Sequence, residues 1–232
     1  LELRRLRVPH LYSLFYEPPN PLVPRRLRLE IDERIGAQGE IVRPLDEASI
    51  FKAIERIREE GASSVAICLL HSYRNGDHER QVGEIVRREL PDLFCCLSVD
   101  VLAEIREYER TSTTVINAYL GPIVKGYMDS LNNKAVSANI SAPLRIMQSN
   151  GGVMSVSKAA EFPVRIVESG PAAGVVAAQR VGKRAGIENI ISFDMGGTTA
   201  KASLIEDGQL SWTTEHEIGA GISLSSRLVK GG

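Results

Sequence analysis

The sequence predicts an α/β fold, because helical and strand patterns alternate along most of its 232 residues. Residues 46–61 and 77–90 carry the apolar spacing of amphipathic helices, and each is followed by a short apolar run typical of a buried strand, at residues 64–70 and 93–99. Glycine-containing loops then follow several predicted strands, and the carboxyl ends of strands are where open α/β sheets bind ligands.

The composition excludes two classes of protein. There are 28 Lys and Arg against 29 Asp and Glu, a formal net charge of −1, which argues against binding nucleic acid through bulk positive charge. No apolar run approaches the roughly 20 residues needed to span a bilayer, so we expect no membrane segment. The three cysteines, Cys68, Cys95 and Cys96, lie in apolar runs rather than at metal-ligand spacing, which indicates a reduced, cytoplasmic protein.

The first half of the chain starts with a basic, proline-rich stretch over residues 1–45, where no long helix fits. Residues 27–31 alternate between apolar and polar and predict one exposed strand. Within residues 46–61, the apolar side chains fall on one helical face, and Gly61 is a candidate C-cap. Residues 104–110 form a charged run, which favours a solvated helix start.

The second half predicts further elements in order. We expect a helix over residues 111–131, bent near Gly121-Pro122, and a surface loop over 132–143. Pro171 is expected at the start of a helix that ends before Gly186. Asp207-Gly208 predicts a hairpin turn. The strands are expected at residues 144–148, 164–167, 189–193 (buried), 200–204 (alternating) and 209–214.

The segment from Phe193 to Glu206 carries the most chemical information. An apolar strand ends in Asp194, and Gly196, Gly197, Thr198 and Thr199 lead into a second strand. Two glycines allow a tight turn that exposes backbone N–H groups to an anion, and the threonines add hydroxyl donors. Asp194 could hold a metal ion. The pattern differs from a P-loop, in which the glycine loop opens a helix; the alternative is a polar hairpin without a ligand.

Two further loops are candidates for anion binding. Ser169 and Gly170 precede a predicted helix, whose N-terminus attracts negative charge, although a plain capped helix with Ser169 as N-cap explains the same residues. Asn150 and Gly151 follow another predicted strand, where Asn-Gly is most often only a turn. These loops would form one site if they met the hairpin at the same end of a sheet. The four histidines are scattered, and we interpret His71 as a loop residue.

Several segments together resemble the hydantoinase A/5-oxoprolinase family, which includes ATP-dependent hydantoinase and acetone carboxylase subunits. The stretches that carry the resemblance occur in family order along nearly the whole chain. They are EYERTSTTVINAYLGP (107–122), SNGGVMS (149–155), ESGPAAGV (168–175) and FDMGGTTAK (193–201), with weaker matches at LVPRRLRLEIDERI (22–35) and LLHSYRNGDHE (69–79).

The resemblance implies an incomplete actin/hexokinase-like, ribonuclease-H-like ATPase fold. Residues 1–110 would belong to the family's N-terminal region, and residues 111–232 would begin the hydantoinase A domain, with a phosphate-binding hairpin at 193–206. ATP and Mg²⁺ are then the implied cofactors, and Asp194 is both the catalytic residue and the metal ligand. The nucleotide would contact the three loops through Gly196, Gly197, Thr198, Thr199, Ser169, Gly170, Asn150 and Gly151.

The implied reaction is hydrolysis of a cyclic amide, such as a hydantoin or 5-oxoproline, after ATP-driven activation. An acetone carboxylase-like reaction and a non-catalytic ATP-binding module remain alternatives. A small-molecule substrate, a hydantoinase B-type partner subunit and an oligomer are expected. Lys201 stands where many family members have Asp, which we expect to change metal handling or the substrate. The family's N-terminal hairpin is absent, so we expect an internal part of a longer subunit that is inactive alone.

Overall fold

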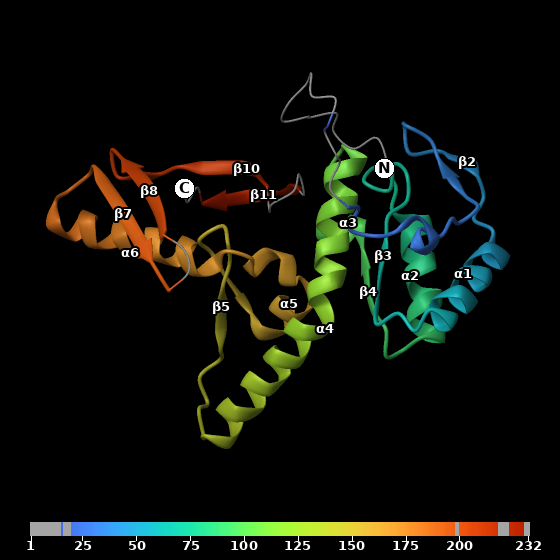
Figure 1. Cartoon of the computed structure of the whole chain (residues 1–232), viewed down its shortest axis with the longest axis horizontal. Helices are drawn as coiled ribbons and strands as arrows, with labels where there is room; N and C mark the ends of the chain where they lie inside the picture. The colour runs from blue at the N-terminus through green and yellow to red at the C-terminus, as the bar shows by residue number, and fades with distance from the viewer. Residues whose placement is uncertain (1–14, 16–19, 198–199, 218–222, 230–232) are drawn as a thin grey trace. The chain divides into compact units, whose positions relative to one another are not determined.

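The computed structural model describes residues 15, 20–197, 200–217 and 223–229. The chain divides into two compact units, which we describe separately (Figure 1). The first unit comprises Leu1–Pro122 with Glu217–Leu224, and the second comprises Ile123–His216 with Ser225–Gly232. Helices and strands alternate in both units, as expected of an α/β protein.

The core of the first unit is the predicted helix–strand–helix–strand layer. Helix α1 (Glu47–Glu59), strand β3 (Ser64–Ile67), helix α2 (Asp77–Glu89) and strand β4 (Phe94–Leu97) follow one another, and β3 and β4 pair in parallel. Such a pair needs a crossover connection, which α2 supplies. One face of each helix is buried with the strands. The core side chains are Ile50, Ile54, Ile67, Val82, Ile85, Val86 and Leu97.

The ends of α1 follow from its sequence. Asp46 is the N-cap, and its side chain accepts a hydrogen bond from the Ala48 N–H at 3.1 Å. Gly61 lies just beyond the helix with a φ of 61°, in the left-handed region that glycine adopts without steric cost. The predicted helix and its C-terminal glycine are therefore confirmed.

The prediction of a strand over residues 27–31 is wrong. A short 3₁₀ helix, η1 (Arg25–Leu27), replaces its start, because Pro24 fixes the backbone just before it. The strands lie further on, at β1 (Arg34–Ile35) and β2 (Ile41–Arg43), which form a small antiparallel pair. The turn between them includes Gly39 at a φ of 92°.

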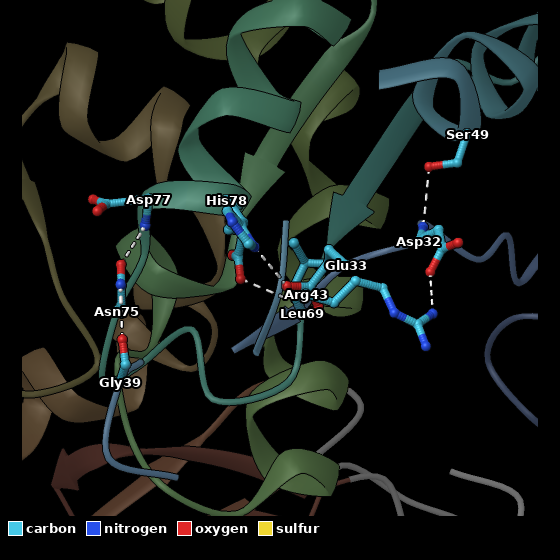
Figure 2. Close-up of polar contacts among 10 residues, drawn as sticks. Asp32, Glu33, Gly39, Arg43, Ser49, Leu69, Asn75, Asp77 and His78 are labelled. Carbon is cyan, nitrogen blue, oxygen red and sulfur yellow. Dashed lines mark hydrogen bonds and ion pairs between the residues drawn. The ribbon is translucent and has the colours of Figure 1, made fainter. Parts of the chain in front are cut away.

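Polar contacts connect this hairpin to the start of α2 (Figure 2). His78 Nδ1 lies 2.8 Å from Glu33 Oε2, and both side chains are almost completely buried. Asn75 donates from Nδ2 to the carbonyl of Gly39 at 3.0 Å, and its Oδ1 accepts from the N–H of Asp77 at 3.0 Å. Asn75 thus satisfies one of the free amides at the helix start.

After the short helix α3 (Ser98–Val101), helix α4 runs from Glu107 to Ser137 with Pro122 inside it. It is longer than predicted at both ends, and residues 132–137 continue the helix instead of forming a loop. The predicted solvated start is also wrong, because Glu109 and Arg110 are buried. Arg110 Nη2 donates to the carbonyl of Leu69 at 2.8 Å, and its guanidinium lies 5.4 Å from the centre of the Tyr73 ring.

The second unit begins with a small antiparallel pair, β5 (Arg145–Met147) and β6 (Val153–Ser155). Helix α5 (Val156–Glu161) follows, and Ser155 caps it by accepting from the N–H of Lys158. The strand predicted at residues 164–167 is instead a 3₁₀ helix, η2 (Pro163–Ile166). Pro163 explains this difference, because proline favours the first position of a helix and has no N–H for a ladder.

The remainder of the second unit is a helix packed on a sheet. Helix α6 (Ser169–Ala185) contacts strands β7 (Ile190–Met195), β8 (Ala200–Glu206) and β9 (Gln209–Leu210) (Figure 1). The three strands are antiparallel, and Asp207-Gly208 forms the predicted turn between β8 and β9. Gly186 ends the helix at a φ of 72°, as expected. Strands β10 (Trp212–Glu217) and β11 (Ser223–Val229) form a separate pair.

All three cysteines are free, and their thiols are poorly ionisable. Burial raises the pKa of Cys68 and of Cys96 to about 12 and that of Cys95 to about 11. Unfolding returns each thiol to its ordinary pKa. The raised pKa values of the folded state therefore contribute stability that is fully present below about pH 9. That contribution is lost as the pH rises through the folded values.

We therefore expect iodoacetamide at pH 8 to alkylate the three thiols slowly in the native protein and rapidly in urea, because the thiolate is the nucleophile. Mass spectrometry of the peptides that contain Cys68, Cys95 and Cys96 measures both rates. Labelling of any of the three at the unfolded rate under native conditions would contradict the burial described above.

Candidate functional site

The predicted strand–turn–strand segment forms as expected. Strands β7 and β8 are antiparallel neighbours, with Asp194 opposite Lys201 and Met195 opposite Ala200. Gly196 and Gly197 lie in the turn and are exposed, and a Cβ atom added to either would meet no described atom within 4 Å. Thr198 and Thr199 lie outside the described residues. The next described element after the glycines is strand β8 rather than a helix, so the segment differs from a P-loop as predicted.

The face of these two strands that lies toward α6 is apolar at one end and polar at the other. Residues directly opposite each other in a ladder share a face, and this face carries Ile190 with Ile205, Ser192 with Ser203 and Asp194 with Lys201. Ile205 is buried against Ala172 and Val175 of α6. The face therefore changes from core packing to charged groups as the strands approach the glycine turn.

The start of α6 lies beside this charged end. The helix begins at Ser169, two residues before the predicted Pro171, and its N-cap is Glu168 rather than Ser169. Glu168 has a φ of 66° and a ψ of 17°, and its side chain makes no capping hydrogen bond. Its carboxylate instead forms an ion pair with Lys201 Nζ. Ser169 and Gly170 occupy the first turn, where backbone amides have no partner within the helix and the dipole favours an anion.

A pocket of about 380 Å³ separates the helix start from the hairpin. This volume falls within the range of small-molecule sites. Its lining comes from α6 and from the two strands: Gly170, Pro171, Gly174, Val175, Ala178, Ser192, Phe193, Asp194, Lys201 and Ser203. Two of the three predicted loops therefore meet at one pocket, and Asp194 and Gly170 both line it.

The third predicted loop lies elsewhere on α6. Asn150 Oδ1 accepts from the Gly152 N–H at 2.9 Å, and Gly151, at a φ of 74°, lies close to Val176. Ser149 is buried, and its hydroxyl donates to the carbonyl of Arg165 at 2.9 Å. Within the described residues, Ser169, Asn150 and Gly151 are not part of the pocket lining, so their contact with a nucleotide stays a prediction.

Sequence reasoning missed Glu168, Ser192 and Ser203 as candidate site residues. Ser192 and Ser203 were interpreted only as strand residues, although the two-residue period places them on the face of Asp194. Glu168 was assigned only to a loop. No local signal marks its ion pair, because Lys201 is 33 residues further along the chain.

The part of the chain that the structure describes has neither a metal-binding cluster nor a membrane-spanning helix. It contains no group of three or more His, Cys, Asp or Glu side chains placed to hold a metal ion. Likewise, none of its helices has the length and apolar character required to cross a bilayer. Among the described residues that line the pocket, Asp194 is the carboxylate, and it is exposed.

Two models of protein families match the sequence of this chain. The profile described as hydantoinase/oxoprolinase matches residues 110–230, and the hydantoinase/oxoprolinase N-terminal region matches residues 1–90. The chain belongs to the hydantoinase/oxoprolinase family. Its fold is the α/β, actin-like ATPase fold of that family, and the resemblance inferred from the motifs is confirmed.

Relatives with named activities include amide hydrolases. The alpha subunit of caprolactamase from Pseudomonas jessenii is 39% identical over 208 residues, which cover 90% of this chain and 30% of the relative. The 5-oxoprolinase of Saccharomyces cerevisiae is 35% identical over 196 residues, covering 82% of this chain and 15% of the relative. The names of these two relatives thus refer to cyclic amides.

Solved structures of two relatives share the fold. The ATP-dependent caprolactamase of Pseudomonas jessenii superposes with a TM-score of 0.84 at 36% identity, over 100% of this chain and 34% of the other. A nucleotide-free acetone carboxylase superposes with a TM-score of 0.83 at 30% identity, over 92% of this chain and 30% of the other. The chain spans about a third of the length of these relatives or less.

Proposed function

We propose that this chain holds the phosphates of ATP in the pocket between α6 and the β7–β8 hairpin. The observation that carries the proposal is the meeting of the α6 N-terminus, the exposed glycine turn and Asp194 around one pocket. Backbone amides at a helix start and in a glycine turn bind phosphate oxygens. Gly196, Gly197, Thr198, Thr199, Ser169 and Gly170 are the proposed phosphate contacts, and Asn150 and Gly151 would act from the neighbouring loop.

Asp194 is the proposed catalytic residue and the ligand of Mg²⁺. Magnesium in phosphoryl-transfer sites is bound by one or two carboxylates together with phosphate oxygens and waters. A single exposed carboxylate at the end of β7 suits this arrangement, even though the described residues form no larger acidic cluster. Bound Mg²⁺ neutralises charge on the transferred phosphoryl group. The contribution of the chain is to position the phosphates by the glycine turn and the helix start.

We propose that the longer subunit hydrolyses a cyclic amide, such as a hydantoin, 5-oxoproline or a related lactam. The γ-phosphoryl group of ATP would transfer to the amide oxygen with release of ADP, which makes the carbonyl carbon more electrophilic. Water would add to that carbon, and cleavage of the C–N bond would open the ring and leave an acyl phosphate. A second water would hydrolyse the acyl phosphate to the carboxylate and phosphate. The similarity to caprolactamase and to 5-oxoprolinase favours this branch.

A carboxylase of the acetone carboxylase type is the second candidate, and the structural similarity to acetone carboxylase supports it. A non-catalytic ATP-binding module is the third candidate; retention of Asp194 and both turn glycines argues against it.

The organisation of the whole protein is also a proposal. We propose a boundary near residue 110, between the family's N-terminal region and its hydantoinase A domain, and the profile matches at 1–90 and 110–230 support it. Relatives are named as alpha, beta and gamma subunits. This favours a complex with a hydantoinase B-type subunit, a cytoplasmic oligomer, and little activity of residues 1–232 alone.

Phosphate release from ATP by the full-length protein with its companion subunit tests the proposed reaction. We expect hydantoin, 5-oxoproline or caprolactam to raise the rate above the ATP-only background, and acetone with bicarbonate to leave it unchanged. The reverse pattern would favour the carboxylase, and no stimulation by any of them would contradict both enzymes.

The variant Gly197→Val tests the position of the phosphates. The turn has room for a side chain within the described structure, so the fold should tolerate valine, whereas a phosphate that approaches the backbone should not. We expect ATP affinity, measured by calorimetry, to fall at least about tenfold, a change of roughly 1.4 kcal/mol. Gly126→Val in α4, another open position, serves as the control and should bind normally. Equal affinity of the two variants would place the phosphates elsewhere.

A further inference from the structure

The pocket contains a cation that is already paired. Lys201 and Glu168 form an ion pair that links β8 to the N-cap of α6. The side chain of Lys201 is 24% exposed and that of Glu168 is 39% exposed, so both remain accessible to a ligand. Lys201 also lines the pocket and lies opposite Asp194 on the same face of the hairpin. The ammonium group is therefore held beside the proposed phosphate position by a competing carboxylate.

The backbone at Glu168 shows how that carboxylate reaches Lys201. Asp and Glu side chains near a helix start commonly interact with its free amides. The Glu168 side chain makes no such bond and has a left-handed backbone, which is uncommon for a residue other than glycine. In the first turn, Pro171 has no N–H and the Ala172 N–H bonds to the Glu168 carbonyl at 3.3 Å, so the amides that can meet an anion are those of Ser169 and Gly170. The carboxylate of Glu168 meanwhile pairs with Lys201, the cation that the same anion would use.

The charges of the pocket indicate that the Glu168–Lys201 pair opposes the binding of ATP. With Lys201 neutralised by Glu168, no side chain that lines the described pocket offers a free positive charge to phosphate, and the carboxylate of Asp194 is left for the proposed Mg²⁺. An unpaired Lys201 would reverse this effect, because an ammonium group forms charge-assisted hydrogen bonds to phosphate. An exposed or partly exposed ion pair is weak enough to be exchanged for such a contact.

We propose that the Glu168–Lys201 pair is an exchangeable latch, in which the phosphates of ATP displace Glu168 and take Lys201 as a ligand. This inference rests on the proposed ATP site and adds to it a specificity-determining cation and a competing anion. It predicts opposite effects of the two partners: loss of Glu168 strengthens ATP binding, and loss of Lys201 weakens it. A pair with only a structural role would produce no gain of affinity from either change.

Calorimetric titration of the full-length protein with ATP tests the latch. We expect Glu168→Gln to tighten ATP binding by roughly fivefold, the effect of removing a weak ion pair. Lys201→Met should weaken it by roughly tenfold to a hundredfold, the effect of losing a charged hydrogen bond. The double variant should bind like Lys201→Met, because Glu168 acts only through Lys201. Glu168→Ala provides the same test if glutamine retains a hydrogen bond to Lys201.

The pair of Lys158 and Glu161 on α5 provides the matched control. Its Nζ–Oε2 distance is 2.6 Å, and it lies outside the pocket lining. Lys158→Met and Glu161→Gln make the same changes of charge and should leave ATP affinity unaltered. Thermal melting of all variants checks that each protein is folded.

The outcomes separate the latch from the site. Failure of the wild-type protein to bind ATP, or equal affinity of Gly197→Val and wild type, would overturn the ATP site and the latch together. The latch alone would be overturned if Gly197→Val loses ATP affinity as expected while Glu168→Gln or Lys201→Met binds ATP like the wild type. Weaker binding in Glu168→Gln would also overturn it, since Glu168 would then assist the nucleotide.

Discussion

Replacement of Asp194 by alanine in the full-length protein should reduce ATP turnover on the order of a thousandfold and leave the fold intact. Asp194 lies exposed at the end of β7 and contributes nothing to the core. Its loss should therefore change the free energy of unfolding by no more than about 0.5 kcal/mol. The large effect should fall on catalysis, because the proposed role of the carboxylate is to hold Mg²⁺ against the phosphoryl group.

Phosphate release and a thermal melt measure these two quantities on the same preparation. Asp194→Asn is the sharper variant, because it keeps the size of the side chain and removes only its charge. Glu206→Gln, at the other end of β8 and equally exposed, is the matched control and should retain full turnover. Unchanged turnover in Asp194→Asn would mean that the hairpin does not handle the phosphates.

The features that sequence predicted well depend on local chemistry. The hairpin follows from the Gly196-Gly197 pair at one end, from the Asp207-Gly208 turn with positive φ at the other, and from the two-residue alternation between them. Helices α1 and α2 follow from regular apolar spacing, and Gly61 and Gly186 mark helix ends through their left-handed backbones. Each of these signals needs only neighbouring residues.

The features that sequence predicted poorly depend on distant partners. Arg110 belongs to a charged run, yet it is buried because a carbonyl 41 residues away accepts its hydrogen bond. The apolar run before Asp194 predicts a buried strand, and the structure buries only part of it. In the described chain, one face of β7 packs with α6, while Ile191, Phe193 and Met195 on the other are 71%, 65% and 70% exposed. The periodicity of the sequence shows which side chains are apolar. It does not show whether another element packs against them.

The pocket illustrates the same limit within one site. Asp194 and the turn glycines were found from a continuous motif, whereas Glu168 was not. Its role depends on the left-handed backbone before α6 and on the pairing of β8 with β7, which brings Lys201 beside the helix start. The motif locates the glycine turn that we propose to hold phosphate, and the tertiary structure supplies the charges around it.

The carboxylate of Glu79 should contribute more to the stability of the first unit than any exposed ion pair. It is completely buried at the start of α2 and accepts three hydrogen bonds. The donors are the N–H of Leu69 at 3.2 Å, the hydroxyl of Ser98 at 3.0 Å and the N–H of Val99 at 3.0 Å. Leu69 follows β3 and Val99 follows β4, so one side chain fixes the ends of both parallel strands.

We expect Glu79→Ala to destabilise this unit by about 3 kcal/mol, because it removes the acceptor of the Leu69 and Val99 N–H groups and leaves the buried Ser98 hydroxyl with Ser72 alone. Glu79→Gln should cost less, since the amide keeps one accepting oxygen and the shape of the side chain. Hydrogen exchange of the peptides that contain β3 and β4 measures the local free energy of opening in the full-length protein. Glu84→Ala, on the exposed face of the same helix, is the control and should leave exchange unchanged. Protection of both strands at the wild-type level in Glu79→Ala would show that the carboxylate does not hold them together.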